Sequence, residues 1–440
     1  MKRRIISILV MVFVLLLLVA ACNSSKQVLK QQNISNEVKQ AKELEKKSLE
    51  LDLREVSSEV KIKLWEDVRP VVGHTIDQLI EKFQKKYPNI KVERTHMEAK
   101  ELRQNTQRSF IVGNGPTLTL SSFDDIRPFS IMGIAQSLDV LMSEEMKNMY
   151  VENALPTMTL KGHIYGVPVT MSNLVLFYNK KLVDEVPKNW EELISIAKDL
   201  NKDIDNDGKI DQYGLLSPWI EAVWWIAFQD AWVLDKDNNL ILDTKATKEA
   251  LQFVHDLKFK DKILPEKTDY DLMDSLFKEG KGAFIVNWDC SYKNYIEDDD
   301  VELGVASLPK FKNIGKYAPS MISGSGYIML SDLPENKQIA TLKFIKFMTG
   351  KEAQKILVEK HKLLPTNKSL YDLAIITEDQ LMNVSAQQLK TAKPVPVILK
   401  RKAVYEAITP VLQSVMAGDL KPAKGATEIQ EIAEKIISGM

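Results

Sequence analysis

The chain has 440 residues, of which 45% are hydrophobic and 27% are charged, so it can build two globular lobes and is too apolar to be disordered over most of its length. Its 59 basic and 60 acidic residues give a formal net charge of −1, which supplies no overall field to attract nucleic acid or an anionic surface. Charge is therefore expected to act only at particular sites.

The N-terminus has the features of a secretory signal. Basic residues precede an apolar run that ends at Leu18, and two alanines follow before Cys22. This order is typical of an exported chain, whereas a plain transmembrane anchor, the alternative, would need a longer run. The segment 18–22 resembles the lipobox of bacterial lipoproteins. We therefore expect residues 1–21 to be a cleaved signal peptide and Cys22 to carry lipid such as palmitate.

The mature chain then keeps a single further cysteine, Cys290. This predicts no intrachain disulfide, and the chain contains none of the cysteine spacings that indicate zinc. The residues after Cys22 are polar, contain no proline or aromatic residue up to position 58, and alternate lysine with glutamate or glutamine. We therefore predict that residues 22–58 form a flexible tether.

Alternating strand and helix patterns begin at residue 60. Residues 60–65 have apolar side chains at every second position, which is typical of a strand. Residues 76–87 have helical spacing and residues 90–92 return to a strand, so one βαβ unit is complete. Residues 117–120 form a further predicted strand.

Polar and aromatic residues follow two of these strands. A parallel α/β sheet binds its ligand at the carboxyl ends of the strands, so these residues are candidates for ligand binding. The alternative for the carboxylates is solvated surface or helix capping. Asp67 and Asp124 are the preferred hydrogen-bonding pair. The candidates at this edge are Trp65, Glu66, Asp67, Asp124 and Asp125.

The stretch 162–180 is interpreted as a bridge between two lobes. Its β-branched and aromatic residues favour extended backbone, and Pro168 cannot donate to a strand ladder, so it belongs at a strand start or a crossing. Farther on, Asn189 and Glu192 have the spacing of a capping box for a helix that starts at Trp190. Further helices are expected at 244–257, 271–277, 337–348, 351–358, 402–416 and 427–437, and strands at 282–287 and 325–330.

The acidic loop 203–211 is the sharpest short motif in the chain. Oxygen-bearing residues at alternate positions, glycine at the sixth and isoleucine at the eighth match the start of a calcium loop. The twelfth position is Gly214, so a second segment would have to supply the bidentate carboxylate. A turn without metal is the alternative. The predicted ligands of a structural Ca²⁺ are Asp203, Asp205, Asp207, Lys209 and Asp211, and no other cofactor is expected.

Several segments, taken in order, resemble the family 1 extracellular solute-binding proteins of ATP-binding cassette importers, the group that includes maltose-binding protein. The resemblance implies an α/β fold of two periplasmic-binding-protein-like lobes, joined by three hinge crossings and closing on the ligand. The similar segments are KGHIYGVP at 161–168, FYNKKL at 177–182, PKNWEEL at 187–193, FKEGKGAF at 277–284 and GVASLP at 304–309.

The resemblance also implies the domain boundaries. Lobe I is expected at residues 59–168 and 309–362, and lobe II at 173–306 and 367–440. The three hinge crossings are expected near 169–172, 307–309 and 363–366.

A site for a sugar needs aromatic platforms beside carboxylates and amides, because a sugar presents both hydroxyls and a hydrocarbon face. By the resemblance, Trp219 falls where sugar-binding relatives carry a stacking aromatic, with core packing as the alternative. Trp288 lies close to another such position, which aligns with Cys290 itself. Maltose-binding protein has Glu in place of Ser172 and Trp near Tyr405, so the ligand need not be maltose. The glycines of the segment 320–326 allow close approach of the backbone, so we predict a ligand-facing turn there, with an ordinary connection as the alternative. The later candidates are Ser172, Asn173, Trp219, Trp288, Asp289, Ser323, Gly324 and Tyr405.

The resemblance implies capture of an extracellular oligosaccharide of maltodextrin type and its delivery to the permease subunits of an ATP-binding cassette importer. We expect a monomer without nucleic-acid partners, lipid-anchored on the extracellular face of the membrane of a Gram-positive bacterium. Only five histidines are present, and neither an HExxH nor a GxSxG motif occurs, so no enzymatic activity is predicted. The alternatives are a secreted glycan-active enzyme, a surface sensor or adhesin, or a receptor for a non-sugar solute.

Overall fold

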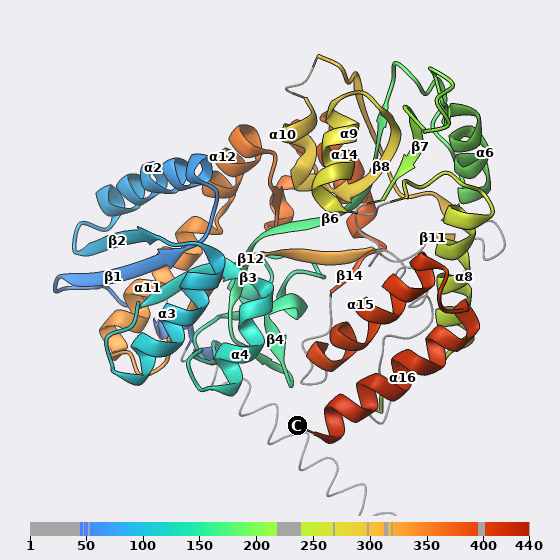
Figure 1. Ribbon diagram of the computed structural model, residues 1–440. Coiled ribbons are helices and arrows are strands. Elements are labelled where there is room, and N and C mark those ends of the chain that lie inside the picture. Colours follow the sequence, from blue (N-terminus) through green and yellow to red (C-terminus); the bar gives the residue numbers. More distant parts are fainter. Residues whose placement is uncertain are drawn as a thin grey trace, which may run out of the picture.

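The computed structural model describes residues 45–46, 48–51, 53–217, 239–266, 269–296, 299–311, 316–317, 320–394 and 401–439. Within this part of the chain, one large sheet runs through two lobes and helices pack on its faces (Figure 1). This is the two-lobed α/β fold that the sequence predicts. The main path of the sheet is β2 (Ile90–His96), β1 (Val60–Glu66), β3 (Leu118–Ser122), β12 (Met321–Met329), β6 (Val167–Asn179), β8 (Gly282–Trp288) and β7 (Tyr213–Leu216).

Lobe I begins with the predicted βαβ unit. Strand β1 pairs in parallel with β2 on one side and with β3 on the other, and β12 adds antiparallel to β3. The helices of this lobe are α2 (Pro70–Lys86), α3 (Ala99–Ile111), α4 (Ile126–Ile131), α5 (Glu144–Lys147), α11 (Glu335–Met348) and α12 (Lys351–His361). Its shorter elements are the strands β4 (Thr159–Leu160) and β5 (His163–Ile164) and the 3-10 helices η1 (Phe123–Asp125) and η2 (Leu155–Met158).

Lobe II is built on the second half of β6, which pairs with β8 and with β9 (Leu303–Ala306). Its helices are α6 (Trp190–Leu200), α8 (Lys245–Phe259), α9 (Tyr270–Lys278), α10 (Tyr292–Tyr295), α13 (Ala374–Thr377), α14 (Gln380–Leu389), α15 (Arg401–Ala417) and α16 (Pro422–Ser438). Its shorter elements are β10 (Lys310–Phe311), β11 (Lys316–Tyr317), η4 (Asp289–Ser291) and, near the crossings, β13 (Leu364–Pro365), β14 (Lys393–Pro394) and η5 (Lys368–Leu370).

Strand β6 is the bridge that the sequence predicts at 162–180. Its first half pairs with β12 as far as Asn173, and from Leu174 onward it pairs with β8. Strand β13 pairs with the first half of β6 at Thr170 and Met171, so residues 364 and 365 lie beside the crossing strand, while the hinge boundary at 363–366 stays a prediction. A single extended strand therefore carries the chain from one lobe to the other.

The second crossing differs from the expected boundary at 307–309. Phe311 stacks on Trp190 of lobe II, with ring centroids 5.6 Å apart, and Lys310 forms a bridge with Asn189. Residues 310 and 311 therefore pack against lobe II, and the chain returns to lobe I only along β12. The physical reason is that Phe311 fills space beside Trp190, a long-range contact that the local pattern does not reveal.

The end of the predicted tether packs on lobe I. The described residues from 45 to 53 are helical, and Leu51 is buried in the core of the lobe. The carboxylate of Glu45 accepts the backbone N–H of Glu144 at 3.0 Å. Arg54 forms an ion pair with Glu335 of α11, with 2.8 Å between Nη1 and Oε2. The structure thus differs from the predicted flexible tether over this final part, while Cys22 lies outside the described residues.

The apolar core continues through the crossings. One cluster of buried side chains contains Leu64 and Phe344 of lobe I together with Phe177 and Tyr295 of lobe II. A second cluster, around Trp190, fills the other face of lobe II. Among the helices of the described ranges, none is both long enough and apolar enough to cross a membrane.

Candidate functional site

A cavity of about 110 Å³ lies where the β1–α2 loop meets the crossing strands. Its lining includes Arg69 from the loop, Thr170 from β6, Ser325 from β12 and Leu363 just before β13. The hydroxyl oxygens of Thr170 and Ser325 are 3.1 Å apart. The rest of its lining is mostly apolar and comes from lobe I, including Ile76 of α2, Met348 of α11 and Leu357 of α12, so the cavity lies on the lobe I side of the crossings.

The lobe I side of this region carries the predicted carboxylates. Trp65 and Asp67 are partly exposed beside the carboxyl end of β1, and Asp124 is exposed. Asp125 is buried and pairs with Arg103 of α3. The structure therefore brings Asp67 and Asp125 together with Arg103, which sequence reasoning missed because nothing in the helical pattern of α3 marks that side chain.

The ionisation of these carboxyl groups is shifted by their surroundings. Burial, with the negative charge of Asp125 as the next cause, raises the pKa of Asp67 to about 6. Burial also raises the pKa of Asp125, although the neighbouring Arg103 acts in the opposite direction. Asp67 is thus a hydrogen-bond acceptor whose charge changes near neutral pH.

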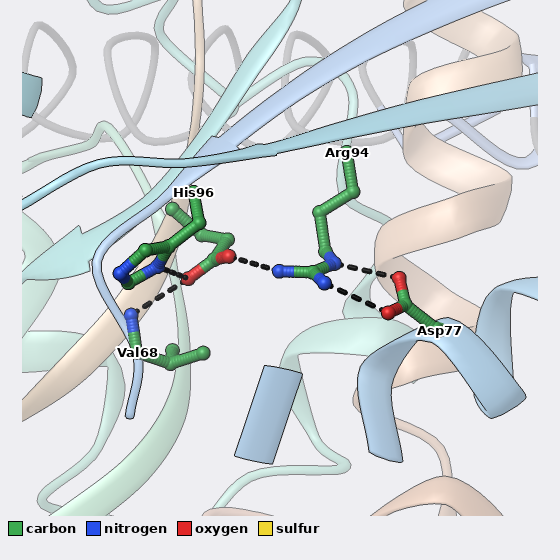
Figure 2. Close-up of polar contacts among 5 residues, drawn as sticks. Val68, Asp77, Arg94 and His96 are labelled. Atoms are coloured by element: carbon green, nitrogen blue, oxygen red, sulfur yellow. Dashed lines mark hydrogen bonds and ion pairs between the residues drawn. The ribbon is translucent and has the colours of Figure 1, made fainter. Parts of the chain in front are cut away.

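Glu66 does not belong to the ligand-facing surface, contrary to the prediction. Its side chain is fully buried, and its carboxylate pairs with Arg94 and lies 3.2 Å from Nδ1 of His96. The same carboxylate accepts the backbone N–H of Val68 at 2.7 Å. Figure 2 shows these contacts, together with the pairing of Arg94 to Asp77. The oxygens of Glu66 are therefore occupied inside lobe I.

The lobe II side is formed at the end of β8. Asp289 is buried there and accepts a hydrogen bond from the Ser172 hydroxyl on β6. Burial raises the pKa of Asp289 to about 6. Trp288 beside it is partly exposed, and Cys290 is an exposed free thiol.

Asn173 is a second candidate that the structure turns inward. It is fully buried, and its amide nitrogen donates to the backbone carbonyl of Ser385 at 3.1 Å. Asn173 therefore attaches α14 to the crossing strand, and its burial leaves it no surface for a ligand.

The predicted ligand-facing turn around Ser323 and Gly324 is part of strand β12. Ser323 lies opposite Ser172 of β6 and is partly exposed. Gly324 has φ of 155° and approaches β6 so closely that a Cβ would lie 2.1 Å from the carbonyl oxygen of Thr170. The glycine is thus required by strand packing.

Tyr405 lies on α15 and is partly buried. Its hydroxyl is 3.9 Å from the sulfur of Met321, at the start of β12. This places it near a crossing. Trp219, the predicted stacking aromatic, lies outside the described residues.

The loop 203–211 gathers three of its predicted metal ligands. Oxygen atoms of Asp203, Asp205 and Asp211 lie within 4.8 Å of one another. Asp207 is outside this group and forms an ion pair with Lys209 at 3.2 Å. Lys209 can offer a ligand only through its backbone carbonyl, because its ammonium group has no lone pair. Three convergent carboxylates are a donor set that suits a hard cation such as Ca²⁺.

Comparison with known proteins gives a consistent set of similarities. A family model described as bacterial extracellular solute-binding protein matches residues 78–384. A maltotriose-binding protein of Pyrococcus abyssi is 25% identical over 389 residues, which cover 86% of this chain and 82% of the relative. A maltooligosaccharide ABC transporter solute-binding lipoprotein of Streptococcus pneumoniae is 26% identical over 324 residues, 71% of this chain and 74% of the relative.

Solved structures agree with these similarities. A maltose/maltodextrin-binding domain from Bdellovibrio bacteriovorus, bound to maltotriose, has a TM-score of 0.73 and 31% identity, over 86% of this chain and 100% of that one. A cyclo/maltodextrin-binding protein complexed with maltotetraose has a TM-score of 0.77 and 25% identity, over 86% of this chain and 98% of that one. These matches confirm the two-lobed fold expected from the resemblance.

Proposed function

The chain belongs to the bacterial extracellular solute-binding proteins, and we propose that it captures a maltooligosaccharide outside the cell for an ATP-binding cassette importer. The observation that carries the proposal is that Trp65 and Asp67 of lobe I and Trp288 and Asp289 of lobe II stand at strand ends beside the crossings. The proposal is also supported by relatives whose names state maltotriose or maltooligosaccharide binding.

The side chains at this place suit a neutral sugar. Ionised Asp67 accepts hydrogen bonds from sugar hydroxyls, and the partly exposed Ser172, whose hydroxyl donates to buried Asp289, offers a further acceptor oxygen. The partly exposed rings of Trp65 and Trp288 supply apolar faces for the hydrocarbon side of the sugar. A ligand that contacts both lobes stabilises their closed arrangement, because it binds that arrangement better than the open one.

Binding is tested by thermal unfolding with maltose, maltotriose and maltotetraose. A ligand at a hundred times its dissociation constant should add about 2.7 kcal/mol to the free energy of unfolding. Trp65→Ala should abolish most of this gain. Phe259→Ala is the matched control, since Phe259 is an exposed aromatic at the end of α8 in lobe II. Absence of any shift with all three sugars in the wild-type protein would rule out the proposed ligand class.

We also propose that the mature protein is a monomer held on the extracellular face of the membrane of a Gram-positive bacterium through lipid on Cys22, where it meets the permease subunits. Labelling with a radioactive fatty acid should mark the wild-type protein and leave Cys22→Ser unlabelled. Equal labelling of Cys290→Ser is the control. Release of the wild-type protein into the medium without label would contradict the anchor.

We further propose that the loop 203–211 binds Ca²⁺ in a structural role. The support is the convergence of Asp203, Asp205 and Asp211 on one point. Their oxygens also accept loop N–H groups, such as that of Gly208 to Asp203 at 2.9 Å, so the ligands are held in place. Titration calorimetry should detect one calcium site that Asp203→Asn removes and Asp184→Asn, an exposed control on the same lobe, retains. A wild-type protein without calcium uptake would contradict the site.

A further inference from the structure

The inward-facing side of β1 carries a charge where the pattern of the strand calls for an apolar residue. Val60, Ile62 and Leu64 are buried at alternate positions, and Glu66 takes the next inward position with no exposed surface. Burying a carboxylate costs free energy unless it is paired and hydrogen-bonded. A leucine would continue the apolar face at no such cost, so the carboxylate is expected to perform a task that an apolar side chain cannot.

The partners of Glu66 show what that task is. One carboxylate oxygen pairs with Arg94, and the other accepts the N–H of Val68 at 2.7 Å and lies 3.2 Å from Nδ1 of His96. Val68 follows two residues later, in the loop between β1 and α2. Glu66 thus turns back and holds the backbone of the loop that leaves its own strand.

Arg94 links this contact to the next helix. Its guanidinium donates to both carboxylate oxygens of Asp77 on α2, at 2.6 and 2.7 Å (Figure 2). It also packs against Gly73 of α2, where a Cβ would lie 3.0 Å from Nη1. The loop is therefore fixed at both ends, by Glu66 to the strand and through Arg94 to the helix.

The fixed loop is the one that presents ligand-side residues. It contains Asp67 and Arg69, and Arg69 lines the cavity at the crossings. We propose that Glu66 is a positioning residue, whose buried carboxylate holds the Val68 N–H and so presents Asp67 and Arg69 to the ligand. This inference rests on the proposed sugar-binding function of the same site. Glu66 acts through the loop and does not touch the ligand.

The test compares Glu66→Leu with Glu66→Gln, which keeps an oxygen acceptor for the Val68 N–H. The control is Ile80→Ala, a buried apolar truncation on α2 away from the loop. Hydrogen exchange at the Val68 amide, the dissociation constant for maltotriose and urea unfolding are measured for each variant. Glu66→Leu should exchange Val68 faster and bind about tenfold more weakly, the size expected for a lost hydrogen bond to a charged acceptor. Glu66→Gln should stay closer to wild type in both measurements.

Ile80→Ala should lose stability and keep the wild-type dissociation constant. Wild-type exchange and affinity in Glu66→Leu would overturn the proposal, and so would an equal loss of affinity in Ile80→Ala, which would mark a general effect of stability. If Glu66→Leu does not fold, Glu66→Met replaces it, with faster Val68 exchange expected and unchanged exchange contradicting the proposal. If the wild-type protein binds no maltooligosaccharide, the proposed function fails, whereas the exchange measurements still decide the role of Glu66.

Discussion

At the scale of single residues, the proposed role of Asp67 in sugar binding predicts that the affinity depends on pH. Its pKa is raised to about 6, and a sugar hydroxyl that donates to its carboxylate favours the ionised form. Protonation therefore competes with the ligand, and the affinity should fall by about tenfold for each pH unit below 6. Titration calorimetry with maltotriose between pH 5 and pH 8 measures this dependence.

Asp67→Asn should bind maltotriose weakly at all these pH values and lose most of the pH dependence. Asp372→Asn, on the exposed surface, is the control and should follow the wild-type curve. A pH dependence that survives in Asp67→Asn would assign the effect to another group, with Asp125 the first to examine because its pKa is also raised.

Asp289 makes a prediction about stability rather than binding. Burial raises its pKa from the ordinary value of 3.8 to about 6. A raised pKa in the folded state means that its contribution to stability is fully present below pH 3.8 and is lost as the pH rises through 6. Asp289→Asn should therefore match the wild type near pH 4 and exceed its free energy of unfolding at pH 7, by up to about 3 kcal/mol.

Urea unfolding at the two pH values measures this difference. The asparagine side chain keeps an oxygen that can accept the Ser172 hydroxyl, so the hydrogen bond to β6 is retained in the variant. Asp372→Asn again serves as the control. A variant that matches wild type at pH 4 and is less stable at pH 7 would show that the negative charge of Asp289 supports the fold.

For the candidate site residues, the sequence predicts their place at strand ends better than it predicts which way their side chains point. Asp67 and Asp125 follow strands, which the local pattern reveals, and the structure places them together. Glu66 shares the inward register of Leu64, so strict alternation along the strand is a signal that could have removed it from the ligand-side candidates. Arg94 and Arg103 could not be identified, because each acts on a residue 22 or more positions away in the chain.

At the scale of elements, strong local signals identified helices correctly. Asn189 accepts the backbone N–H of Glu192 at 2.9 Å and begins α6, as the capping box predicts. Helix α3 was not predicted, because it buries only Leu102 and Thr106 and so has almost no apolar stripe. The glycines around Gly324 predict a turn, but the structure has a strand there. The glycine is required by the close approach of β6, which is distant in sequence and so invisible to the local pattern.

The docked segment before β1 makes a prediction at this scale. Leu51 is 6% exposed, whereas Leu53 is 73% exposed. Leu51→Asp should release the segment from lobe I, because a charge is costly in an apolar site. Limited proteolysis should then cut faster between residues 45 and 58, and hydrogen exchange should rise there.

Leu53→Asp is the control and should behave as wild type in both measurements. The same segment cleaved equally fast in all three proteins would mean that the packing contributes little in solution. A slower cut in wild type and Leu53→Asp than in Leu51→Asp would establish that the tether to Cys22 ends on lobe I, and so that lobe I is the anchored lobe.

At the scale of the whole molecule, the lobes are joined by paired crossings that Gln354 ties together. This buried residue of α12 donates to the carbonyl of Val169 on β6 at 2.6 Å and accepts the N–H of Thr366 at 2.8 Å. The resemblance implies hinges near 169–172 and 363–366, and these boundaries stay predictions. It also implies a hinge near 307–309, whereas β10 packs on lobe II through Phe311, a contact that only the folded core reveals.

Gln354→Leu should destabilise the protein by about 2–4 kcal/mol, because it leaves a buried carbonyl and a buried N–H without partners. The crossings should also loosen, so that maltotriose compacts the variant less than the wild type in small-angle X-ray scattering. Gln78→Leu, exposed on α2, is the matched control and should change neither property.

Because the apolar core is continuous from Leu64 to Phe177, calorimetry of the wild type should show one cooperative transition. Two separate wild-type transitions would mean that the lobes unfold as independent cooperative units despite the hydrogen bonds of Gln354.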